Sequence, residues 1–284
     1  MEFEILRIIV ALIGTAAAAY YDVFNKKNVP DKLLYAFLGV ALAINVFDPS
    51  AFLRNLPVAA VMVVAMYLLY RLGQLGGADV MVLAAIYASI PMIENPLIGQ
   101  AAQSDVLSSL QMPSIAVVTS MSVLLFAIWI IVRYVPVALR ETFRGKAKFG
   151  AVQLGQSFLL LVSFGAFVYL FAQLPVFSVG LVVVIEVLFI AAIFFTLYKD
   201  FIIGSMVVWK RRPEQEDVLA LEMIDIKLIR KHSIGRLVDR EQMKRMSKLK
   251  RKWPVLDLPI FLPYVLAALI LYVLFGNQLV YGLI

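Results

Sequence analysis

The sequence has 284 residues, of which 62% are apolar and 16% are charged, and its formal net charge is +7. Soluble globular chains are about 45–50% apolar and about 25% charged. These values exclude an ordinary cytosolic enzyme, a disordered or collagen-like chain and a coiled coil. Cysteine is absent, which excludes disulfides, thiolate metal sites and a cysteine nucleophile. His232 is the single histidine. Any acid–base chemistry is therefore expected to depend on carboxylates.

Apolar runs long enough to cross a bilayer, about 20 residues each, recur along the chain and predict an all-α polytopic membrane protein. The acidic start lacks the basic region of a cleaved signal peptide, so the first run is expected to remain as a helix. The second run is short and the fourth contains Pro91, defects that neighbouring helices can shelter. The predicted spans are 3–21, 33–47, 51–71, 79–97, 114–133, 151–173, 176–198 and 258–282.

The distribution of basic residues predicts how these eight spans are oriented. If the segments after spans one, three, five and seven face the cytoplasm, every Lys and Arg except Arg7 and Arg54 lies on that side. Cytoplasmic loops of membrane proteins carry such an excess. The protein is therefore expected in the plasma membrane with both termini outside. Because the basic residues follow the membrane edge, the lipid bilayer is the expected partner and nucleic acid is not.

A polar stretch before the last span predicts a small subdomain. Residues 224–228 alternate apolar and charged side chains, the period of a half-buried strand. The segment Ser233-Ile234-Gly235 indicates a turn. Asp239, followed three residues later by Gln242, indicates the start of a short helix over 240–250.

Three parts of the chain follow from this pattern. A membrane domain is expected over 1–198, a basic cytoplasmic subdomain of α+β type over 199–257, and the last transmembrane helix over 258–284. The basic helix of the subdomain could lie against anionic lipid headgroups. A solvated connector without a fold of its own is the alternative for the middle part.

Two acids at span ends require an explanation, because carboxylates in or beside membrane spans are costly. Asp22 ends the first span after a run of alanines, and Asp79 begins the fourth after Gly76, Gly77 and Ala78. One span reaches the cytoplasm and the other leaves it, so both side chains are expected at a similar depth. The small neighbouring residues allow helices to approach closely.

Such a carboxylate pair has a chemical interpretation and a structural one. Two close carboxyl groups share one proton, which is the arrangement of an aspartic protease. The ionised member takes a proton from water, the water attacks the peptide carbonyl, and the protonated member stabilises the oxyanion. In the structural interpretation, each Asp only caps a helix or marks an interface between helices.

Glu186 lies within the seventh span with no basic residue at its depth. Pairing with a hydroxyl or a backbone carbonyl is expected, and an auxiliary catalytic or proton-relay role is the alternative. A proton- or cation-coupled transporter could also use Glu186, Asp22 and Asp79. Transporters often contain internal repeats, and the second half of this chain offers no counterpart to the Asp pair.

Two motifs resemble those of the type IV prepilin peptidase family. Asp22 is followed by Lys26, Lys27 and a Val-Pro-Asp step, which is similar to the first motif of the family. The segment from Gly76 to Asp79 resembles the second motif, GxGD, with Ala78 in place of its second glycine. The archaeal preflagellin (archaellin) and prepilin peptidases tolerate a small residue there. The prolines before and within the last span are also similar; they are Pro254, Pro259 and Pro263.

The resemblance implies a membrane-embedded aspartyl endopeptidase that removes short basic leaders from preflagellins or type IV prepilins at the cytoplasmic face. Asp22 and Asp79 carry over as the catalytic pair, and Gly76, Gly77 and Ala78 as the active-site loop. No metal or organic cofactor is implied. Bacterial members that also methylate their products often have a cysteine zinc motif, so no methyltransferase activity is expected here.

One related class of protease is the alternative within enzymes. Presenilin-type and signal-peptide-peptidase-type proteases place the first Asp after a Tyr, and Tyr21-Asp22 fits that pattern. They also need a Pro-Ala-Leu motif in a late span. This sequence has no such motif, which favours the prepilin peptidase resemblance.

Overall fold

The computed structural model describes residues 2–25, 28–47, 49–73, 75–92, 113–144, 150–171, 179–214, 217–249 and 251–276. This part of the chain is mostly helical and contains one three-stranded sheet. Five of the described helices are long and apolar enough to cross a membrane, and two apolar helices are shorter. The chain is therefore a multi-span helical membrane protein, as its composition predicts.

A helix lies within the described part of each predicted span, although the number of membrane crossings stays a prediction. Helices in the second and fourth spans end at Ile44 and Ser89, before the predicted ends, and the helix of the last span begins at Leu262, after the predicted start. Two helices continue beyond the predicted ends at 133 and 198, because a helix does not have to stop where its apolar run stops. The helices are α1 (Glu2–Phe24), α2 (Asp31–Ile44), α3 (Ser50–Arg71), α4 (Gly77–Ser89), α5 (Ser114–Phe143), α6 (Ala151–Phe171), α7 (Val179–Met206) and α10 (Leu262–Phe275).

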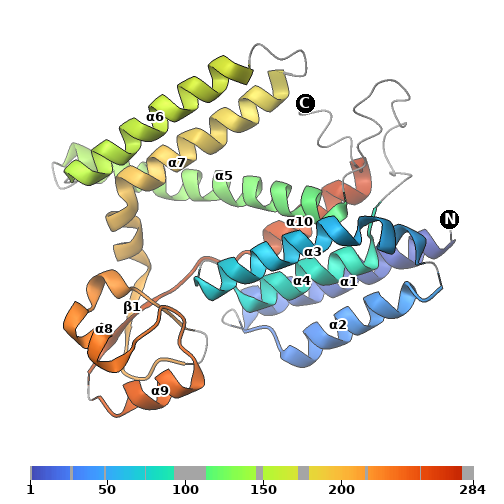
Figure 1. Ribbon diagram of the computed structural model, residues 1–284, viewed down its shortest axis with the longest axis horizontal. Helices are drawn as coiled ribbons and strands as arrows, with labels where there is room; N and C mark the ends of the chain where they lie inside the picture. The colour runs from blue at the N-terminus through green and yellow to red at the C-terminus, as the bar shows by residue number, and fades with distance from the viewer. Residues whose placement is uncertain are drawn as a thin grey trace.

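The short helix α4 lies inside a bundle, where it packs against α1, α2, α3 and α5 (Figure 1). Val82, Leu83, Ala85 and Ile86 are almost completely buried. A helix that is apolar on all sides is stable when other helices surround it. The bundle therefore provides the shelter that the weak fourth span requires. Helix α10 packs against α1 and α5 at the same core.

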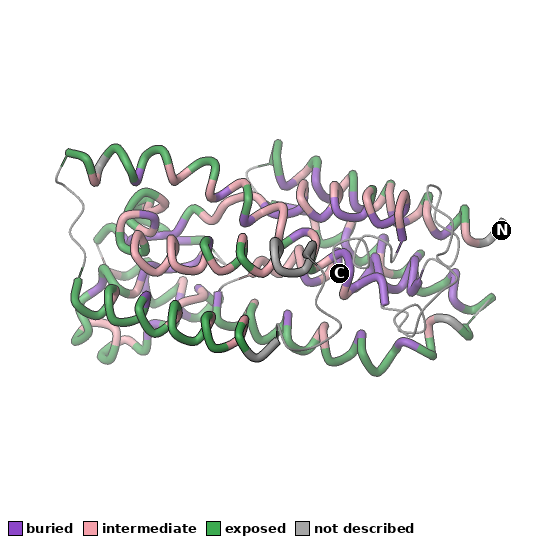
Figure 2. The backbone as a smooth tube through the Cα atoms, turned by 90° about the horizontal axis from the view of Figure 1, so that it is seen from above, coloured by how far each residue is buried: buried purple, intermediate pink, exposed green. Residues whose placement is uncertain are grey.

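Helices α6 and α7 form a pair that joins the rest of the protein through contacts between α7 and α5 (Figure 1). The rings of Phe164 and Phe189 stack between them, with centroids 3.8 Å apart. Figure 2 shows that α6 is exposed along nearly its whole length, whereas buried positions gather near the N-terminal helices. The exposed surface of α6 is apolar, as expected for a helix in contact with lipid.

A separate subdomain is inserted between α7 and α10 (Figure 1). Strand β3 pairs antiparallel with both neighbours in the sheet order β1-β3-β2. Its core contains Trp253, Leu219 and Met246, which are at most 1% exposed. Its elements are β1 (Val207–Lys210), β2 (Val218–Leu219), a 3-10 turn (Leu221–Met223), α8 (Ile226–His232), α9 (Arg240–Ser247) and β3 (Trp253–Leu256).

This subdomain confirms two local predictions and moves one boundary. The Asp239 carboxylate accepts the backbone N–H of Gln242 at 2.6 Å and caps α9. Ser233 adopts the left-handed conformation, with φ of 48°, at the predicted turn. Because α7 continues to Met206, the subdomain fold begins at Val207 and not at residue 199.

The predicted strand over 224–228 is wrong, because helix α8 begins at Ile226. The Asp225 carboxylate accepts the backbone N–H of Lys227 at 2.9 Å and caps this helix. Leu228 and Ile229 pack against the subdomain core while Ile226 is exposed. Five alternating residues fit one helical turn as well as a strand. The capping bond from Asp225 favours the helix.

The prolines before and within the predicted last span lie in different elements of the structure. Pro254 lies in β3, opposite Trp209 of β1, and its carbonyl accepts the N–H of Ala220 at 3.0 Å. Pro263 lies in the first turn of α10, where proline is favoured because that turn needs no N–H donor. Only Pro263 therefore belongs to the start of the last helix.

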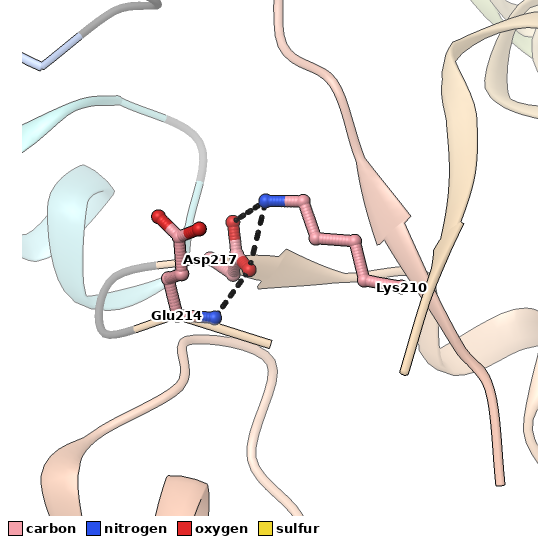
Figure 3. Close-up of polar contacts among 3 residues, drawn as sticks. All are labelled: Lys210, Glu214 and Asp217. Carbon is pink, nitrogen blue, oxygen red and sulfur yellow. Dashed lines mark hydrogen bonds and ion pairs between the residues drawn. The ribbon is translucent and has the colours of Figure 1, made fainter. Parts of the chain in front are cut away.

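Replacing Asp217 by Ala is expected to destabilise the β1–β2 connection more than replacing Lys210 by Met. The Asp217 carboxylate accepts both the Lys210 ammonium, at 2.9 and 3.1 Å, and the Glu214 backbone N–H, at 2.6 Å (Figure 3). Losing the backbone bond as well as the ion pair should cost about 1–2 kcal/mol. Hydrogen exchange of the β2 amides measures this, and equal effects of the two substitutions would contradict it.

Candidate active site

Asp22 lies in the last turn of α1, on the side that packs against α4 and α10. Ala18 and Ala19 in the preceding turn are buried, and their small side chains let these neighbours approach. Asp22 itself is 7% exposed. A carboxylate at such a position requires polar partners, because burial of an unpaired charge is costly.

Backbone amides at the start of α10 provide such partners. The Asp22 Oδ2 atom accepts the N–H of Phe261 at 3.2 Å and the N–H of Leu262 at 3.1 Å. The first N–H groups of a helix have no partner within the helix, and a negative charge is stabilised there. The carboxylate at the end of the first helix therefore caps the last described helix.

Asp79 lies in the first turn of α4, where its Oδ2 accepts the backbone N–H of Gly76 at 3.0 Å. A Cβ atom at Gly76 would lie only 2.9 Å from this same oxygen. Gly76 is therefore required by space beside the carboxylate and not by a left-handed backbone. Gly77 and Ala78 form the start of the helix and are half-buried.

The structure brings Asp22 and Asp79 together. Helices α1 and α4 pack against each other, one ending and the other beginning at the same end of the bundle. The two carboxyl groups are close enough to interact electrostatically. Two neighbouring carboxylates, one buried and the other half-buried, cannot both ionise easily, so the pair can hold one shared proton.

The inserted subdomain contacts the connection between α3 and α4, which leads through Gly76 to Asp79. Gly73, which follows α3, has a φ of +67°, and a Cβ there would lie 3.2 Å from a methyl group of Val218 and 3.5 Å from the Arg236 side chain. After β3, the chain returns from the subdomain to Phe261 at the start of α10. The subdomain is therefore connected to both sides of the carboxylate pair.

Glu186 does not join this pair. It is exposed on α7, which packs against α5 and α6. Among the described residues, no group of three or more His, Asp or Glu side chains gathers at a point that could hold a metal ion. The carboxylate pair is thus the chemical centre that the described part of the chain presents.

Replacing Glu186 by Gln is expected to change the leader cleavage implied by the motif resemblance by less than about twofold. Glu186 is exposed on α7, which packs against α5 and α6, and Gln keeps the shape of the side chain. Initial cleavage rates of the purified protein measure this. A complete loss of cleavage by a well-folded Glu186→Gln protein would show that Glu186 takes part in catalysis.

A family model adds the decisive comparison, since residues 9–137 match the type IV leader peptidase family. This part of the chain belongs to that family. The matched segment contains both Asp22 and Asp79 together with α2 to α4 and most of α5. The match supports a protease that acts on leader-bearing proteins. No curated protein and no solved structure matches the chain.

The amides of Phe261 and Leu262 are the part of the site that the sequence did not reveal. They lie outside the matched residues of the leader peptidase. Every residue except proline carries a backbone N–H, so the residue types at 261 and 262 give no signal. The available signal was Pro263, which marks the start of a helix but does not identify what that start contacts.

Proposed function

We propose that this protein is an aspartyl endopeptidase in which Asp22 and Asp79 form the catalytic pair. The supporting observation is the convergence of two carboxylates, from the end of α1 and the start of α4, within the matched family segment. The Gly76 amide and its lack of a side chain hold Asp79 in place. Of the three small residues predicted as an active-site loop, Gly76 precedes α4, whereas Gly77 and Ala78 form its first turn beside Asp79.

The proposed reaction needs one proton on the pair. The ionised Asp takes a proton from a water molecule, and the resulting hydroxide attacks the carbonyl carbon of the scissile peptide bond. The protonated Asp donates its hydrogen to the carbonyl oxygen as negative charge develops there. The Asp that took the proton from water gives it to the leaving amine nitrogen as the peptide bond breaks. The other Asp regains its proton from a hydroxyl group of the tetrahedral intermediate, which becomes the new carboxyl group.

The proposed substrates are preflagellins or type IV prepilins, cut at the cytoplasmic face. The distribution of Lys and Arg supports a cytoplasmic position for this end of α1 and α4, with both termini outside. A short basic leader would remain on that side for the same electrostatic reason. Ala78 in the second motif favours the archaeal preflagellin and prepilin peptidases. Methyl transfer is not part of the proposal, and neither is a metal or organic cofactor.

The test is cleavage of a candidate preprotein with a short basic leader by the purified protein in detergent or in liposomes. Gel mobility and mass spectrometry of the product show whether a cut occurs and where. The expected result is one cut between the basic leader and the apolar helix. A folded protein that leaves several such preproteins intact, but carries protons or cations across liposomes, would support a transporter instead.

A further inference from the structure

The hydrogen bonds at the start of α10 distinguish the two carboxyl groups of the pair. Asp22 accepts two backbone N–H groups from α10, whereas Asp79 accepts one, from Gly76. We propose that the Phe261 and Leu262 amides assign the two roles: Asp22 is the ionised partner that takes the proton from water, and Asp79 is the protonated partner. This inference rests on the proposed function and adds the assignment of roles to it.

Both α10 amides donate to the same oxygen of Asp22, and their stabilising effect is greater for the ionised form than for the protonated form. An oxygen that accepts two N–H groups is stabilised when it carries negative charge, and such charge-assisted bonds are about twice as strong as neutral ones. The aligned peptide dipoles of the 14-residue helix α10 add to this, because its positive end faces the carboxylate.

The packing around this turn keeps the two amides in place. The Phe261 ring lies edge-on against Phe126 of α5, with centroids 5.4 Å apart, and Phe126 also contacts Tyr264. Leu262 is completely buried. Before the turn, the N–H of Asp257 donates to the carbonyl of Met206 at 2.8 Å. The donors are thus oriented before substrate binds, which is how fixed dipoles stabilise charge most effectively.

Other ionisable groups on the helices packed against α1 do not distinguish the two carboxyl groups of the pair in this way. On α2, Asp31 and Lys32 are exposed to solvent. On α10, Tyr264 interacts with Arg133 of α5, whose guanidinium also lies over the Trp129 ring, 5.4 Å from its centroid. Asp79 on α4 interacts with Asp22 directly, as its partner in the pair.

Infrared titration of the carboxyl groups tests the assignment without substrate. The spectrum of a protein with both Asp22→Asn and Asp79→Asn is subtracted from that of each single variant. The Asp79→Asn protein then reports Asp22, and the Asp22→Asn protein reports Asp79. We expect Asp22 to lose its proton at the lower pH, and the reverse order would overturn the inference whether or not the protein cleaves leaders.

A backbone substitution tests the role of the α10 amides themselves. Incorporation of the α-hydroxy analogue of leucine at position 262 replaces one N–H by an ester oxygen and keeps the side chain. In the Asp79→Asn background, the Asp22 midpoint is expected to rise by about one pH unit. With both Asp residues present, kcat is expected to fall about tenfold while KM stays nearly constant.

The matched control is the α-hydroxy analogue of valine at position 265, whose N–H donates to the carbonyl of Phe261 and not to Asp22. This ester should lower thermal stability but leave the Asp22 midpoint unchanged. An equal midpoint shift in both esters, or none in the 262 ester, would refute the inference. Loss of cleavage in the Asp variants with an unchanged 262 ester would leave the proposed function standing and reject only the assignment of roles.

Discussion

Replacing either Asp22 or Asp79 by Asn is expected to lower leader cleavage at least about 100-fold while the protein keeps its fold. The Asn side-chain oxygen can still accept the Phe261 and Leu262 amides at position 22, or the Gly76 amide at position 79. It cannot exchange a proton with water or donate one as a carboxylic acid. Cleavage rates measured beside thermal unfolding in detergent separate the loss of chemistry from the loss of structure.

An alanine substitution supplies the contrast for Asp22. In Asp22→Ala, the buried N–H groups of Phe261 and Leu262 lose their acceptor, which should cost about 1–3 kcal/mol for each. Asp22→Ala should therefore lower both stability and activity, whereas Asp22→Asn should lower activity alone. The wild-type rate should also fall at high pH, because the pair loses its shared proton. Full cleavage by either Asn variant would contradict the carboxylate-pair mechanism.

The class of multi-span helical membrane protein could be predicted from the sequence because each span is a long apolar run, and such runs stand out in the composition. The stretch 224–228 could not be assigned in the same way, since five alternating residues fit both a strand and a helical turn. The capping contact from Asp225 favoured the helix. The end of α7 at Met206 was also hidden, because the helix continues after its apolar run.

The candidate site was also predictable only in part. Asp22 and Asp79 were visible because carboxylates beside apolar spans are costly, and their similar depth followed from the alternation of spans. The contact from Asp22 to residues 261 and 262 depends on tertiary structure between distant parts of the chain. The exposure of Glu186 depends on which face α7 turns toward α5 and α6, which composition does not specify.

Replacing Gly76 by Ala is expected to lower kcat by about tenfold or more with little change in global stability. The new Cβ would lie 2.9 Å from Asp79 Oδ2, closer than real Cβ atoms approach another heavy atom. The Asp79 carboxyl group can move by rotating its side chain, and it then loses the Gly76 N–H that orients it toward Asp22. Steady-state cleavage kinetics should show this as a loss of kcat greater than any rise in KM.

Two other substitutions are controls for Gly76→Ala. Gly39→Ala, in α2, introduces the same methyl group where no heavy atom lies within 4 Å, so it should be neutral or stabilise the helix by up to about 1 kcal/mol. Ala78→Gly should retain cleavage, because that position in the first turn of α4 requires only a small residue. If Gly76→Ala cleaves as fast as Gly39→Ala, the space beside Asp79 is not what keeps its carboxyl group in the catalytic position.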